Sequence, residues 1–136
     1  MGKLKVADTM DALATAVATS SLIDAAFGYP VEAVAPGQAT VGYPDPIDFD
    51  MTFGRGADRA TFPVWVMCGL TVDRSTRATV DALIAGSADI KAAIEDHAPA
   101  GAYSSVRVTD AAIESAPLST SGLWALSIRF DCEVIS

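Results

Sequence analysis

The chain has 136 residues and a formal net charge of −8, with 51% hydrophobic and only 19% charged residues. Its length fits one domain with its own core, and its composition excludes an intrinsically disordered chain. The negative charge argues against a surface that grips nucleic acid, because Lys and Arg supply most of the affinity for phosphates, and no run approaches the roughly 20 apolar residues of a membrane helix.

The N-terminal segment predicts one amphipathic helix. Asp8 or Thr9 can cap its start, and the hydroxyl side chains of residues 19–21 compete for backbone hydrogen bonds and end it. The segment faintly resembles a signal peptide, but Asp8, Asp11 and several hydroxyl residues dilute the apolar run, so we expect a soluble chain that keeps this helix. The apolar stripe, at three- and four-residue spacing, consists of Val6, Met10, Leu13 and Val17.

Two short strands are expected before residue 47. Residues 22–29 alternate, with Ile23, Ala25, Phe27 and Tyr29 on one face, which favours a strand; the alternative is that the first helix continues to Phe27 and stops at Gly28. An irregular connection follows from 30 to 37. Residues 38–43 then predict a second short strand, and two prolines stiffen the turn after it.

The segment 47–72 predicts a long hairpin around which the rest of the chain is organised. Its first half alternates with a period of two, and its tip, residues 54–59, is charged and glycine-rich, which suits a partner contact or a plain solubilising turn. Its second half is apolar on both faces: Phe62, Val64, Val66, Cys68 and Leu70 lie on one, and Pro63, Trp65 and Met67 on the other. Such a strand needs cover on both faces, and we expect a helix of the same chain on one and a second subunit on the other.

Two helices and two strands complete the chain. Asp73 or Ser75 caps a helix that stops at Gly86, and Ser87 caps a second helix over 88–97. A strand over 105–113 and a loop over 114–122 precede the last strand, whose predicted core-facing residues are Trp124, Leu126, Ile128, Phe130, Cys132 and Val134. This order predicts a single α+β domain, residues 1–136, with a mostly antiparallel sheet and helices packed on one face.

No residue pattern indicates catalysis or a cofactor. The lone His97 sits at a helix end, and the glycines around Arg55 match no phosphate-binding loop. Cys68 and Cys132 fit buried free thiols better than a disulfide, although neighbouring strands could also bring them together. The carboxylates of Asp45, Asp48 and Asp50 could bind a divalent cation, but a solvated strand face beside arginines is the favoured interpretation.

We therefore expect a protein that is not an enzyme and whose function lies in its surfaces. Aromatic residues and Met are enriched at interfaces, and charged residues on outward strand faces can pair across subunits. The candidate contact residues are Asp48, Asp50, Arg55, Asp58, Arg59, Trp65, Met67, Arg107, Arg129, Asp131 and Glu133.

The hairpin also carries a family likeness. The segment DFDMTFGRGAD at 48–58, continuing into TFPV at 61–64, resembles the tail terminator (tail completion) proteins of long-tailed phages of actinobacteria. The wider layout agrees, with similar segments at 29–30, 39–42, 73–74, 83–87, 90–95, 106–109 and 133–135. The likeness covers most of the chain, and FGRGAD is its most specific part.

This resemblance implies a structural virion protein at the head-proximal end of the tail, assembled in the host cytoplasm. Copies of the chain would form a ring, typically a hexamer, that caps the tail tube protein, ends tube polymerisation and joins the head-side connector. DNA would pass through the lumen without specific binding, and no membrane or cofactor would take part. The alternatives are another neck or head-completion adaptor and, from a different class, a small α+β enzyme or ligand-binding domain.

Overall fold

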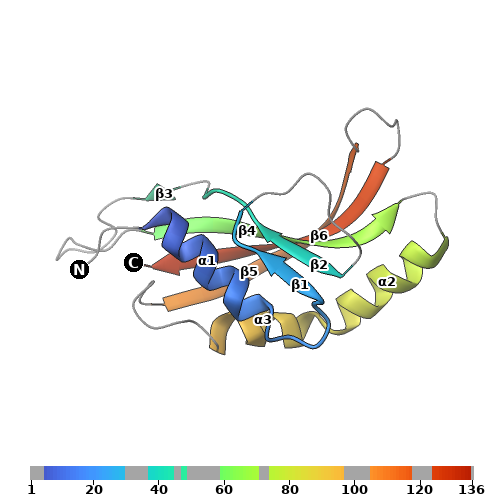
Figure 1. The fold of residues 1–136 in the computed structure, drawn as a ribbon, viewed down its shortest axis with the longest axis horizontal. Coiled ribbons are helices and arrows are strands. Elements are labelled where there is room, and N and C mark those ends of the chain that lie inside the picture. The colour runs from blue at the N-terminus through green and yellow to red at the C-terminus, as the bar shows by residue number, and fades with distance from the viewer. Residues whose placement is uncertain are drawn as a thin grey trace.

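The computed structural model describes residues 5–29, 37–44, 47–48, 59–70, 74–96, 105–117 and 124–135. These residues form three helices and six strands (Figure 1). In chain order the elements are α1 (Val6–Val17), β1 (Ala25–Phe27), β2 (Gln38–Val41), β3 (Ile47–Asp48), β4 (Arg59–Leu70), α2 (Arg74–Ala85), α3 (Ser87–Asp96), β5 (Ser105–Pro117) and β6 (Trp124–Ile135).

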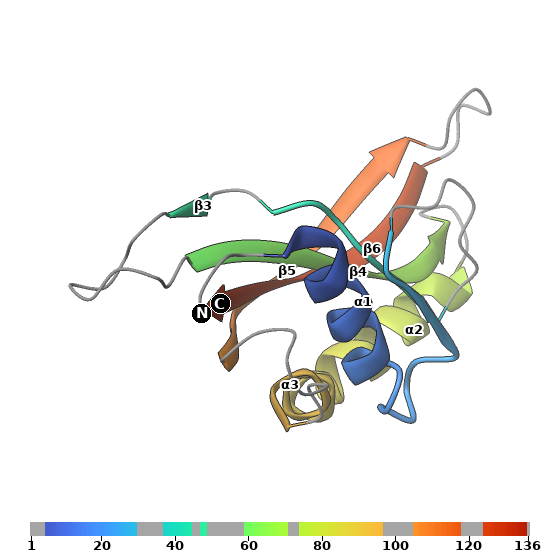
Figure 2. The same cartoon turned by 60° about the vertical axis from the view of Figure 1, so that its left-hand side comes forward.

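The strands form one sheet in the order β1-β2-β4-β6-β5, and β3 pairs with the first residues of β4 (Figure 2). Only β1 and β2 are parallel; the other pairs are antiparallel. The centre is the β4–β6 pair, which runs from Arg59 opposite Ile135 to Leu70 opposite Ala125. Strands far apart in sequence therefore form the middle of the sheet, and the long β5 lies at its edge.

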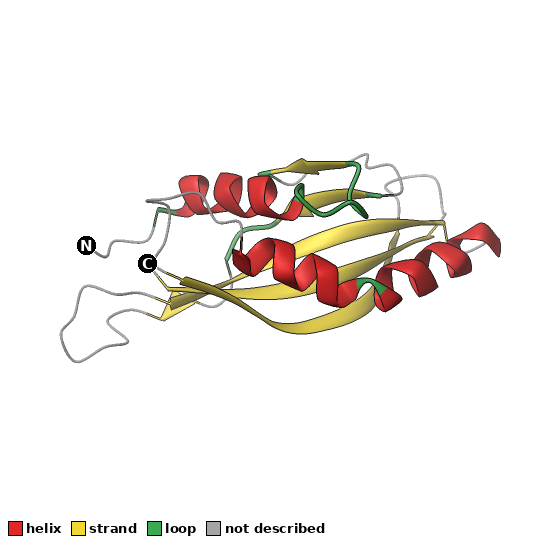
Figure 3. Ribbon diagram, turned by 90° about the horizontal axis from the view of Figure 1, so that it is seen from below, coloured by secondary structure: helices red, strands yellow, loops and turns green. Residues whose placement is uncertain are grey.

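The core lies between one face of the sheet and the three helices, which lie on the same side of β4, β6 and β5 (Figure 3). Direct pairing across strands places alternate residues of β2, β4 and β6 on this face. Helix α1 packs on β1, β2 and α3, whereas α2 packs on β4 and β6, and α3 on β5. The most deeply buried side chains include Leu13, Val17, Val41, Phe62, Val64, Val66, Ile90, Ile94, Ile128, Phe130 and Val134.

The predicted α+β architecture is confirmed, including the strand at 25–27 and the break between two helices at Gly86. Both cysteines are free and buried on the core side, as expected. The end of α1 also agrees, because the Thr19 hydroxyl donates a hydrogen bond to the Ala16 carbonyl at 2.7 Å just past the helix. Neither Asp8 nor Thr9 caps α1, however: the helix begins at Val6, and Lys5, at the N-cap position, makes no side-chain capping bond.

Two bulges interrupt the alternation of the sheet, and the first overturns the predicted direction of one side chain. A bulge between Met67 and Gly69 pairs Gly69 with Leu126 and Leu70 with Ala125, so Leu70 faces away from the helices rather than toward them. A second bulge lies between Val108 and Asp110. Each bulge inserts one residue into one strand and reverses the alternation beyond it.

The β5–β6 hairpin is longer than predicted. Strand β5 continues to Pro117, so residues 114–117 are paired with β6 and are not part of a loop. Trp124 is 49% exposed instead of buried, because it lies beyond the last β4 partner of β6. Ile113, on the same hairpin, is 52% exposed.

Candidate interaction surface

The sheet face that points away from the helices is half-buried along its length. On β4 it consists of Arg59, Thr61, Pro63, Trp65 and Met67, whose partners on β6 are Ile135, Glu133, Asp131, Arg129 and Ser127. Arg107, Asp110, Ala112 and Glu114 continue it on β5. No helix among the described residues covers this surface, which we call the open face.

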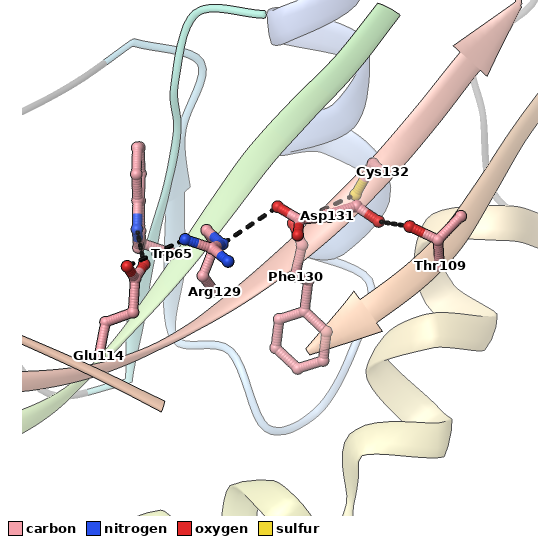
Figure 4. A network of polar contacts seen from close by, with 7 residues as sticks. All are labelled: Trp65, Thr109, Glu114, Arg129, Phe130, Asp131 and Cys132. Carbon is pink, nitrogen blue, oxygen red and sulfur yellow. Dashed lines mark hydrogen bonds and ion pairs between the residues drawn. The ribbon is translucent and has the colours of Figure 1, made fainter. Parts of the chain in front are cut away.

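A polar network crosses the open face on three strands (Figure 4). The Trp65 Nε1–H donates a hydrogen bond to Glu114 Oε1 at 3.0 Å, and Arg129 Nη1 donates to Glu114 Oε2 at 2.9 Å. The Arg129 Nε lies 3.1 Å from Asp131 Oδ1, an ion-pair contact without hydrogen-bond geometry, so this buried nitrogen lacks a hydrogen-bond partner. The network orders large side chains on a surface that remains accessible.

Trp65 is held from the other side by β2. A Cβ atom at Gly42 would lie 2.4 Å from Cζ3 of Trp65, so the indole ring occupies the space that any larger residue at position 42 would need. Thr40, the cross-strand partner of Trp65, is 7% exposed. The indole is therefore fixed between β2 and the Glu114 carboxylate.

Near the start of β4 the charged side chains are more exposed and their contact is longer. Arg59 Nη1 lies 4.0 Å from Glu133 Oε2, and both side chains are about one-third exposed or more, at 40% and 31%. A pair of this kind contributes little to stability because water screens it. Arg107, opposite Glu133 on β5, is exposed. The contact between Arg59 and Glu133 therefore adds little to the stability of the fold.

The structure brings most of the predicted contact residues onto one surface. All those whose side chains are described lie on the open face: Arg59, Trp65, Met67, Arg107, Arg129, Asp131 and Glu133. Asp48 pairs with Arg59 through the β3–β4 register. Asp50, Arg55 and Asp58 lie outside the described residues. The sequence prediction missed Glu114, which joins Trp65 to Arg129, because this residue was assigned to a loop.

The chemistry of the described residues offers no reactive set. No group of three or more His, Cys, Asp or Glu side chains in this part of the chain could hold a metal ion, and His97, Asp45 and Asp50 lie outside it. Burial raises the pKa of the Cys68 thiol to about 11 and that of Cys132 to about 12, so neither is an activated nucleophile. None of the described helices is long and apolar enough to cross a membrane.

A depression of about 280 Å³ lies between the start of α3 and the edge strand β5. Its ionisable lining residues are Lys91 and Asp110, and Lys91 is already paired with Glu95 at 2.7 Å. A catalytic pocket needs convergent polar groups around the reacting atoms, and this depression does not provide them.

No protein-family model matches the chain, and a comparison with curated proteins finds no significant match. Function must therefore be inferred from the open face and from the remaining charged and apolar surfaces.

Proposed function

We propose that this protein is a tail terminator: a structural subunit that forms a ring on the phage tail tube, ends tube polymerisation and offers a joining surface to the head-side connector. The observation that supports this proposal best is the open face. Three long strands expose an ordered surface of aromatic, Met and charged side chains over the whole length of the central β4–β6 pair. Aromatic residues, Met and Arg are enriched where proteins meet proteins.

The shape of this surface also favours a protein partner over a small ligand. Small molecules bind in concave pockets that bury most of their surface, whereas a sheet face presents a broad area. Trp65 and Arg129 belong to the residue types that most often dominate binding energy at interfaces. Their positions are already fixed by Glu114, so docking would require little further ordering.

The end of the β5–β6 hairpin supplies a second contact region. Trp124, opposite Pro117 and beyond the last β4 partner of β6, is 49% exposed, and Ile113, opposite Ile128 on the edge strand β5, is 52% exposed. Large exposed apolar side chains at such a site suit burial against a neighbouring molecule. The acidity of the chain also fits the role, because a lumen with net negative charge repels the phosphates of passing DNA.

The test is genetic. Deleting the gene from its phage is expected to give tails of uncontrolled length that do not join heads. Complementation with the intact chain should restore normal tails, and complementation with Trp65→Ala should not. Ile84→Ala is the matched control, because Ile84 is an exposed apolar residue on a helix and lies away from the open face.

Tails of normal length in the deletion would contradict the proposal. If such tails also lacked heads, the protein would instead act as a neck adaptor between a finished tail and the connector.

A further inference from the structure

The start of α2 carries charges that its own helix does not favour. Arg74 is the first residue of α2 and Arg77 lies one turn later; both are exposed, and the first turn contains no acidic residue. No ion pair joins either arginine to another described residue. The N-terminus of a helix bears a partial positive charge, so cations there are repelled.

The end of α3 has the opposite mismatch. Asp96 is the last residue of α3 and is exposed, and the last turn contains no basic residue. Its neighbour Glu95 is paired with Lys91, whereas Asp96 takes part in no ion pair within the described chain. The C-terminus of a helix bears a partial negative charge, so an anion there is also repelled.

These two mismatches lie at opposite ends of one layer. Helices α2 and α3 follow each other across Gly86 and extend along the molecule, with the start of α2 at one end of the longest axis and the end of α3 toward the other (Figures 1 and 3). Each copy thus has a cationic helix start facing one way and an anionic helix end facing the other.

We infer that the start of α2 in one copy docks against the end of α3 in a second copy. Arg74 and Arg77 would then meet Asp96 and the terminal carbonyl groups of the neighbouring α3, so each mismatched charge would gain an opposite one. The contact joins two different surfaces, and repetition of a head-to-tail contact gives a closed ring or a filament. This inference rests on the proposed function, since it names the contact between ring subunits.

The experiment is a charge-swap series measured by sedimentation velocity over a range of protein concentration and salt. The intact chain is expected to self-associate, less strongly as salt increases. Arg74→Glu with Arg77→Glu, or Asp96→Lys alone, should raise the dissociation constant about tenfold or more, because like charges then meet. The three changes combined should restore it to within about threefold, because the interface again pairs opposite charges.

Thermal unfolding of the dilute monomer separates this role from a structural one. Both sets of reversals place favourable charges at the helix ends, so each is expected to raise the melting temperature while it weakens association. The matched control is Asp89→Lys, in the first turn of α3. It makes the same charge change as Asp96→Lys, but it should lower the melting temperature and leave the dissociation constant unchanged.

A chain that stays monomeric at all concentrations in low salt would overturn the contact. So would a triple variant that self-associates no more strongly than the double arginine variant or Asp96→Lys alone. Unchanged self-association with weaker retention of added duplex DNA in the arginine variant would show that these arginines face nucleic acid, and would overturn it too. None of these outcomes decides the tail-length test of the proposed function, which is a separate measurement. If the charge swaps behave as expected but the deletion gives tails of normal length, the contact between copies stands and the proposed role in the tail is rejected.

Discussion

Gly69 allows the end of β4 to lie close to α2, because it has no side chain and adopts a positive φ without strain. Its φ is +142°, and a Cβ atom placed on it would lie 2.5 Å from the Thr76 hydroxyl oxygen. Thr76 is itself buried, at 3% exposure, so it cannot easily move aside. The same glycine directly follows the bulge that turns Leu70 toward the open face.

Gly69→Ala is therefore expected to destabilise the fold by about 2 kcal/mol or more, from backbone strain and the steric overlap together. The free energy of unfolding in urea measures this effect. Adding Thr76→Ala should recover part of the loss, because it removes the overlap and leaves the strain. A Gly69→Ala chain as stable as the parent would show that neither the close contact nor the φ angle constrains this position.

Glu114 shows why some site residues could not be predicted. Val106 and Val108, on β5, face the core side, and uninterrupted alternation would send every even-numbered residue after them, including Glu114, to the same side. The bulge at Thr109 reverses the alternation and places Glu114 beside Trp65 and Arg129. Nothing in the local sequence specifies that bulge, so pairing with β6 determines the site.

At the scale of elements, α3 is attached to the edge strand through one carboxylate. Glu95 on α3 accepts a hydrogen bond from the Val108 backbone N–H of β5 at 2.9 Å, as well as two from Lys91. The carboxylate thus satisfies a donor that the sheet edge would otherwise leave open. The Lys91 hydrogen bond is the largest cause that lowers the pKa of Glu95, and the Val108 hydrogen bond adds to it against the effect of burial.

This attachment predicts a dependence of stability on pH. Because the pKa of Glu95 is lower in the folded state than its ordinary value of 4.5, its contribution is complete above that value and is lost as pH falls through the folded pKa. We expect the melting temperature of the intact chain to fall more steeply below about pH 4.5 than that of Glu95→Gln. If the melting temperatures of the two chains fall in parallel as pH decreases, Glu95 does not contribute to the loss of stability in acid. Asp81→Asn, an exposed carboxylate on α2 with no ion pair among the described residues, is the control.

The elements themselves were predictable to different degrees. The alternation in β6 determined its core face, because Ile128, Phe130, Cys132 and Val134 are all buried. It failed only at Trp124, where the pattern continues but the covering elements do not. Periodicity reports which side of a strand is apolar, whereas burial also depends on what packs there, and that is a property of the tertiary fold.

At the scale of the molecule, the described helices cover one face of the sheet, and none of them covers the other. Val66 and Met67 are neighbours in β4, yet Val66 is fully buried beneath the helices and Met67 is half-buried on the open face. These two positions give a matched test of the layered arrangement, because the same substitution at each site meets a different environment.

Val66→Glu is expected to destabilise the chain by more than about 4 kcal/mol and to prevent folding, because it places a carboxylate in an apolar core. Met67→Glu should lower the free energy of unfolding by only about 1 kcal/mol, because water can still reach the new carboxylate. If the open face is a contact surface, the folded Met67→Glu protein should nevertheless fail to complement a tail-length defect, since an interface core excludes unpaired charge. Circular dichroism melts establish folding, and electron microscopy of tails establishes assembly. Normal tails with Met67→Glu would mean that the open face is not the proposed contact surface. An unfolded Met67→Glu chain would mean that this face is part of the core.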